Sequence, residues 1–254
     1  MESTGFYVTL PSNASMDIYP NNTAGVFQIR MPKTIYLKGR YEVALSEIQY
    51  PHSWSTFTKQ DELVLYWTDD VFDTTKQHKR VKIPEGYYTT MDELCMAINY
   101  AYDEVRTTDT AYINFLHDPI RRRIKVKLEQ NHGFSVNREL GEVLGLQPYK
   151  FYAASQYADS VSDVKRGFYT LYTYCSVCEP QVVGDHYVPL LRCVGIQGKD
   201  GDIITKTFTD PHYVTVNTNK FDTIEVNIKN DVGEDVSFRS GKVICKLHFR
   251  PKAI

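Results

Sequence analysis

The chain has 254 residues, of which 42% are hydrophobic and 24% charged, with a net charge of −2. This composition is typical of a globular protein and too apolar for a disordered one. The slight acidic excess argues against a protein whose main task is to neutralise nucleic-acid phosphates. No run of about 18 apolar residues occurs, and residues 1–10 lack the pattern of a secretion signal, so we expect neither a membrane span nor export.

Alternation of apolar and polar residues dominates both ends of the chain. Because successive side chains of a strand point to opposite faces, each alternating segment has one buried and one exposed face. Turn residues such as Lys38-Gly39 and Ser240-Gly241 separate these segments. Short strands between turns predict a mainly β protein with a jelly-roll sandwich. The clearest alternating segments are Phe6–Leu10, Tyr41–Leu45, Ile224–Ile228 and Val243–Phe249.

The segment 81–150 breaks this pattern. From Thr90 onward the apolar residues follow the 3.6-residue period of a helix, and Thr90 with Glu93 has capping-box spacing. Two further alternating stretches with a turn between them predict a hairpin, and Asn137 and Gly145 are placed to delimit a short second helix. The sequence therefore predicts a small α+β unit of strand, helix, hairpin and helix.

The carboxyl-terminal part, from about residue 168, supplies roughly five strands, whereas a jelly roll needs about eight. The simplest solution joins it to the strands of the amino-terminal part. We therefore predict one jelly roll formed by residues 1–80 and 151–254, with residues 81–150 inserted between two of its strands.

The five cysteines are scattered and odd in number, so we expect free thiols in a reduced compartment rather than a disulfide framework. Only Cys175 and Cys178 have C-x-x-C spacing, and no second ligand pair follows at zinc-binding spacing. On a strand the two side chains would point to opposite faces, and joint ligation would require a turn. We interpret them as ordinary, partly buried thiols.

Signatures of catalysis are missing from the sequence. It contains no H-x-H or H-E-x-x-H pair, no P-loop, no G-x-S-x-G and no G-x-G-x-x-G. A metal-dependent jelly-roll enzyme would carry an H-x-H pair on one strand. We therefore expect no catalytic residues, no metal and no cofactor, and we expect a binding or assembly role.

Two clusters of basic residues stand out. Lys79 and Arg80 follow His78, and Arg121, Arg122 and Arg123 form an uninterrupted run. One interpretation is contact with nucleic acid or with an acidic partner surface. The other interpretation, which the acidic overall charge favours, is that these residues lie on a solvated turn and at a strand end.

Several longer strings in the sequence are distinctive and together run over nearly the whole chain. They are Tyr19–Thr23, Ile35–His52, Ile83–Tyr87, Val183–Leu191, Phe221–Ile228, Val236–Val243 and Leu247–Arg250. In this order they resemble the minor capsid, or penton, proteins of Polinton/Maverick elements and related adintoviruses. Each string is short, so the ordered set carries the resemblance.

The resemblance implies a structural protein that forms homopentamers at the fivefold vertices of an icosahedral shell. It implies a double jelly-roll major capsid protein as the neighbour, no catalytic residues, location in the virion, and assembly in the cytoplasm or nucleus. The inserted unit would project outward. Whether the gene is viral, a transposon relic or a domesticated capsid gene stays open. The alternative function is a host β-sandwich module that binds carbohydrate or protein.

A ring of five copies needs a head-to-tail interface between two different patches, with aromatic anchors near its centre. Two aromatic segments are candidates for this contact. The first contains Tyr50, His52 and Trp54, and the second contains Tyr149, Phe151 and Tyr152. Packing within the chain itself is the alternative for both segments.

Overall fold

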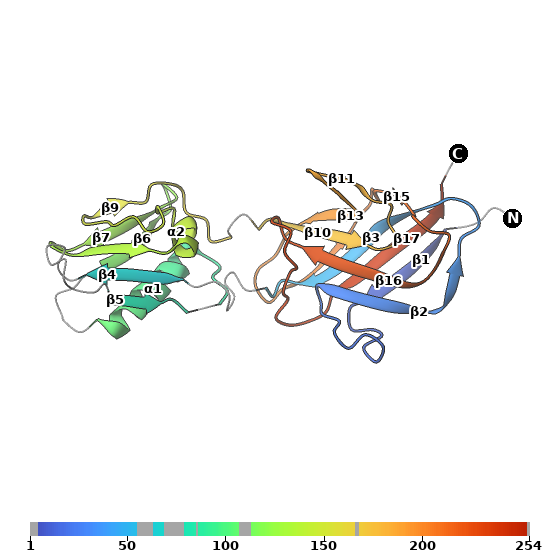
Figure 1. Ribbon diagram of the computed structural model, residues 1–254, viewed down its shortest axis with the longest axis horizontal. Coiled ribbons are helices and arrows are strands. Elements are labelled where there is room, and N and C mark those ends of the chain that lie inside the picture. The colour runs from blue at the N-terminus through green and yellow to red at the C-terminus, as the bar shows by residue number, and fades with distance from the viewer. Residues whose placement is uncertain are drawn as a thin grey trace. The chain divides into compact units, whose positions relative to one another are not determined.

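The computed structural model divides the chain into two compact units (Figure 1). The jelly-roll unit comprises Met1–Trp54 and Phe168–Ile254, and the inserted unit comprises Ser55–Gly167. Each has its own hydrophobic core. The structure describes residues 5–54, 63–68, 79–84, 86–106, 113–165 and 168–252.

Two antiparallel sheets form the jelly-roll unit, with strand orders β1-β17-β3-β14 and β13-β10-β16-β2; the short β15 also pairs with β3. Three of these strands precede the insertion and the others follow it. This order is that of a jelly roll, so the predicted fold class is confirmed. The first sheet contains β1 (Phe6–Pro11), β3 (Tyr41–Pro51), β14 (Ile203–Thr207), β15 (Val214–Thr215) and β17 (Ile244–Pro251). The second contains β2 (Val26–Tyr36), β10 (Thr170–Cys175), β13 (Leu190–Gly195) and β16 (Lys220–Lys229), and a separate hairpin pairs β11 (Gln181–Val183) with β12 (His186–Val188).

The core of this unit follows directly from the alternation in the sequence. On β17, Cys245, Leu247 and Phe249 are fully buried, while the residues between them face outward or are half-buried. The Phe249 ring stacks on Phe6 of β1 and on Phe221 of β16, so it packs against strands of both sheets. One apolar face per strand therefore suffices to fill the space between the sheets.

In its described residues, the inserted unit is an α+β fold with two three-stranded sheets, ordered β5-β4-β8 and β6-β7-β9, and two helices (Figure 1). Helix α1 packs against β6 and closes the core on one side. The elements are β4 (Val64–Thr68), β5 (Lys79–Lys82), α1 (Met91–Val105), β6 (Ile113–Asp118), β7 (Arg123–Leu128), β8 (Gly133–Val136), α2 (Arg138–Leu144) and β9 (Gln156–Tyr157).

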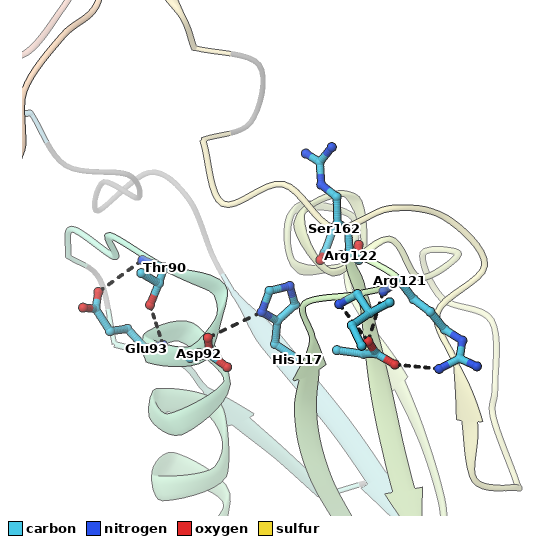
Figure 2. Close-up of polar contacts among 9 residues, drawn as sticks. Thr90, Asp92, Glu93, His117, Arg121, Arg122 and Ser162 are labelled. Carbon is cyan, nitrogen blue, oxygen red and sulfur yellow. Dashed lines mark hydrogen bonds and ion pairs between the residues drawn. The ribbon is translucent and has the colours of Figure 1, made fainter.

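Helix α1 begins at the predicted capping box, and α2 begins and ends at the predicted residues. The Thr90 hydroxyl accepts a hydrogen bond from the Glu93 amide at 3.2 Å, and the Glu93 carboxylate accepts from the Thr90 amide at 3.3 Å (Figure 2). Asn137 caps α2 and also accepts the Val64 amide of β4 at 3.0 Å. Helix α2 ends at Gly145, whose φ of 74° is left-handed and favours glycine.

The inserted unit extends beyond the predicted range of 81–150 at both ends. Strand β4 pairs with β5 and β8, and its Trp67 lies edge-on to Tyr102 of α1 at 5.3 Å. On the other side, Tyr152 stacks on Phe134 of β8 at 5.1 Å. Both segments therefore belong to the core of the inserted unit. A local pattern can indicate a strand such as β4, but it does not say which sheet the strand joins.

Candidate functional site

The turn between β6 and β7 holds the first arginine of the basic run in place. One carboxylate oxygen of Asp118 accepts the amides of Ile120 and Arg121, both at 3.0 Å. The other binds the Arg121 guanidinium at 2.9 Å. The hydrogen bonds from Arg121 lower the pKa of Asp118 to about 2. Asp118 is therefore ionised at neutral pH and offsets the charge of Arg121.

The three arginines do not form one surface. Arg122 has a φ of 54°, which turns its side chain away from that of Arg121, as Figure 2 shows. Its carbonyl oxygen accepts the Ser162 amide at 3.0 Å and the Ser162 hydroxyl at 3.2 Å. The tight turn thus separates the Arg122 side chain from those of its two neighbours. The three arginines are consecutive in the sequence, but their side chains do not point in one direction.

Arg121 and Arg123 instead lie beside Tyr157, which comes much later in the sequence of the inserted unit. The Arg121 guanidinium lies 4.9 Å from the centre of the Tyr157 ring, and the Lys125 ammonium lies 5.5 Å from it. Arg121, Arg123 and Tyr157 line a surface depression of about 360 Å³. Tyr157 was not predicted here, because β9 has only two residues and shows no alternation.

The other predicted basic residues lie on a different sheet. Lys79 and Arg80 are exposed on β5, which pairs with β4 and not with β7. His78 lies outside the described residues. The inserted unit therefore carries two separate basic regions, one on each of its sheets.

The first predicted aromatic contact segment packs inside the jelly-roll unit. Trp54 is 7% exposed; it stacks on His52 at 4.2 Å and lies 5.2 Å from the Phe168 ring. Tyr50 is fully buried, and its hydroxyl accepts the Gln197 amide at 3.2 Å. The three rings thus fill the end of the sandwich at which the insertion begins and ends, and they offer little surface to a neighbour.

The second aromatic segment divides between core and surface. Tyr152 is 3% exposed and donates a 2.6 Å hydrogen bond to Asp159; burial and this carboxylate raise the pKa of Tyr152 to about 12. Tyr149 is 66% exposed, and Phe151 is partly exposed while its ring covers Gly133. A Cβ atom at residue 133 would lie 2.0 Å from the Phe151 ring, so any larger residue there would displace this ring. A subunit contact stays a prediction for Tyr149 and Phe151.

An aromatic surface that sequence reasoning missed lies on the outer side of the first jelly-roll sheet. Tyr7 is 59% exposed and stacks on His248 at 4.4 Å. Tyr213 Oη lies 2.7 Å from His248 Nδ1, the Arg250 guanidinium lies 3.4 Å above the Tyr213 ring, and the Lys246 ammonium lies 5.4 Å from the Tyr7 ring. We name these five residues the Tyr7 face. Tyr7 and His248 stood in the alternating segments, but only the folded chain brings these two segments together with Tyr213, which lies in the loop before β15.

We expect His248 to make the stability of the jelly-roll unit depend on pH. Burial, together with the nearby Arg250 cation, lowers the pKa of His248 below its usual 6.5. The folded state therefore binds fewer protons than the unfolded state, and this contribution to stability is present above pH 6.5 and lost as the pH falls through and below that value. Urea unfolding at pH 8 and pH 5 should show a larger loss of stability for the natural chain than for H248Q. Equal losses would contradict the assignment.

The cysteine pair lies in a turn rather than on opposite faces of a strand. Cys175 ends β10, and the Cys178 amide donates to its carbonyl oxygen at 3.0 Å. Both thiols are buried and free, and the hydrogen bond between them lowers the pKa of Cys175 and raises that of Cys178. Within the described ranges, no group of three or more His, Cys, Asp or Glu side chains is arranged to hold a metal ion. No described helix is long and apolar enough to cross a membrane.

Comparison with known proteins identifies the fold. The chain is similar to the mavirus penton protein, with a TM-score of 0.54 and 11% identity over 97% of this chain and 99% of the other. It also aligns with a chain of the Sputnik virophage structure, with a TM-score of 0.47 and 10% identity over 99% of both chains. No protein-family model and no curated protein matches the sequence. The mavirus alignment covers so much of the chain that it must include the inserted unit, so the chain has the fold of a penton protein.

Proposed function

We propose that this chain is a structural minor capsid protein of the penton type. The observation that supports this most is the alignment with the mavirus penton protein over 97% of the chain, jelly roll and insertion together. A jelly roll alone serves many functions, so the shared fold would be a weak argument without the insertion. The strings that resemble Polinton/Maverick and adintovirus pentons point to the same role independently of the coordinates.

In this role, five copies form a ring at the fivefold vertex of an icosahedral virion. Each copy contacts the next head-to-tail through two different patches, and the ring meets a double jelly-roll major capsid protein at its outer edge. A stable contact of this kind buries more than about 1,000 Å². The surface must therefore be broad, and it should contain aromatic and arginine anchors.

The Tyr7 face fits one side of such a contact. It combines Tyr7 of β1 and the loop residue Tyr213 with a lysine, a histidine and an arginine of β17, already held by stacking and hydrogen bonding. Side chains that are fixed before association lose less conformational entropy when a neighbour covers them. Tyr149 is a single exposed tyrosine after α2, and only the partly exposed Phe151 accompanies it. We therefore place the ring contact on the Tyr7 face rather than on Tyr149.

Size-exclusion chromatography with light scattering tests both statements. The natural chain is expected to form a species close to five times its mass of 29.3 kDa. Y7A is expected to shift the population to monomers, whereas Y149A, which removes an equally exposed tyrosine, keeps the pentamer. A natural chain that stays monomeric at high concentration contradicts the penton proposal and favours the host binding module. If Y149A lost the pentamer and Y7A kept it, the contact between subunits would lie on the inserted unit and not on the Tyr7 face.

A further inference from the structure

The outer side of the β6-β7-β9 sheet carries a row of cations. The pleat of β7 points Ile124 and Val126, both fully buried, toward the core. It points Arg123, Lys125 and Lys127 to the other side, where they are half-buried or exposed. We name these three residues the β7 row. Successive members lie two residues apart on one strand, or about 7 Å.

Neighbouring acidic residues do not neutralise the β7 row. Asp118 lies opposite Arg123 in the strand register, but its carboxylate is taken up by Arg121 and two backbone amides. Asp159 follows β9, and its carboxylate is held by Tyr152 and Lys150. Among the residues that the structure describes, no carboxylate forms an ion pair with the β7 row. The charges of the row are therefore available to an external anion.

The depression beside Tyr157 extends the β7 row at one end. Arg123 belongs both to the row and to the lining of the depression and supplies the unpaired guanidinium there, while Arg121, whose charge is offset by Asp118, borders the same depression. A guanidinium binds the oxygens of a sulfate or phosphate group through two parallel hydrogen bonds, whereas an ammonium acts as a point charge. The surface thus offers a strong anion contact at one end and a line of charges along the strand.

The groups around the β7 row favour a sugar polyanion over a nucleic acid. Single-stranded nucleic acids bind to open aromatic faces on which the bases stack. Tyr157 is the aromatic residue that lines the depression, and its ring is already contacted by Arg121 and Lys125. Across the hairpin, the residues paired with Lys125 and Lys127 are Leu116 and Asn114, which offer no ring for stacking. Regularly spaced charge without a stacking platform suits a chain of sulfated sugars.

We propose that the β7 row, with Arg121 and Tyr157, binds a linear sulfated glycan. The sulfate groups contact the cations along the strand, and one sulfated ring occupies the depression between Arg121, Arg123 and Tyr157. This assignment concerns the inserted unit alone and does not depend on the chain being a penton protein. A monomeric chain would bind in the same way.

Binding is measured on the full chain with a sulfated heparin oligosaccharide, its desulfated form, and a single-stranded DNA oligonucleotide of equal charge. The natural chain is expected to bind the sulfated oligosaccharide most tightly. R123A/K125A/K127A should weaken that binding by about tenfold or more, with a smaller dependence on salt because fewer counterions are released. The control K79A/R80A/K82A removes three cations from β5 in the same unit and should change the affinity by less than about twofold.

Because Arg123 and Lys125 are half-buried, K127E serves as a second variant on an exposed residue that cannot disturb the core. It should weaken binding by several-fold while leaving the thermal melting of the chain unchanged. Equal losses in the β5 control, or equal binding of the desulfated sugar, would overturn the proposal. Tighter binding of the DNA oligonucleotide would overturn it as well and assign the surface to nucleic acid.

Discussion

A chain in which a glycine-rich linker of about five residues replaces residues 55–167 is expected to fold into a complete jelly roll. All strands of both sandwich sheets lie outside the excised segment. The two ends to be joined are close, since the Trp54 and Phe168 rings lie 5.2 Å apart. Trp54 would be the sole tryptophan, because the chain has only two. Its fluorescence should show a buried ring and a single cooperative unfolding transition.

Excision of residues 82–150 should give the opposite result. That deletion leaves β4 without β8, and it exposes Leu63, Leu65 and Trp67, all of which are buried in the inserted unit. Tyr152 would likewise lose Phe134, the ring on which it stacks. An unpaired apolar strand is prone to aggregate. A soluble, cooperatively folded 82–150 deletion, or an unfolded 55–167 deletion, would contradict the division of the chain at Trp54 and Phe168.

Replacement of Trp54 by alanine is expected to destabilise the jelly-roll unit by about 3–5 kcal/mol. The large indole is buried against His52, Phe168 and Phe238, and its removal leaves a cavity that these rings can fill only in part. The remaining Trp67 reports on the inserted unit, whereas far-ultraviolet circular dichroism reports on both units. In urea, the jelly-roll transition seen by dichroism should shift to lower urea concentration while the Trp67 fluorescence transition stays in place.

Y149A is the matched control for this substitution. Tyr149 is exposed, so its removal should change the stability of either unit by less than about 0.5 kcal/mol. If Trp54 served a subunit contact instead of the core, W54A would leave the unfolding of the dissociated chain unchanged. A shift of both transitions together in W54A would show that the two units unfold as one, against their separate cores.

The local features of the fold were predictable from the sequence for a simple reason. Each of these features depends on residues only a few positions apart. They are the alternation along β17, the capping box at Thr90, and the Asn137 and Gly145 caps of α2. The same local rules placed the arginine run at a turn and a strand end, as the structure shows, but they did not give the directions of its side chains. Consecutive residues on a regular strand would alternate between two faces, but the left-handed backbone at Arg122 sends its side chain in a direction that the residue types do not encode.

The two aromatic segments also show that local sequence does not predict which side chains are buried. Tyr50 and Tyr149 look alike in the sequence, each in a short aromatic stretch, yet one is fully buried and the other exposed. Whether a ring is covered depends on segments far away, such as Gln197 for Tyr50. The Tyr7 face arises in the same way, since His248 meets Tyr7 and Tyr213 only after three distant segments are brought together.

Residue types and their spacing were enough to predict the mainly β class, the position of the helical interruption and the helix caps, and they show no known catalytic motif. The folded chain was needed to show that β4 belongs to the insertion, that Arg121 and Arg123 share a depression with Tyr157, and which aromatic rings remain exposed. The physical reason is the range of the interactions. Backbone propensity and capping act over one turn or one strand, whereas strand partners and burial depend on contacts between segments separated by tens to hundreds of residues.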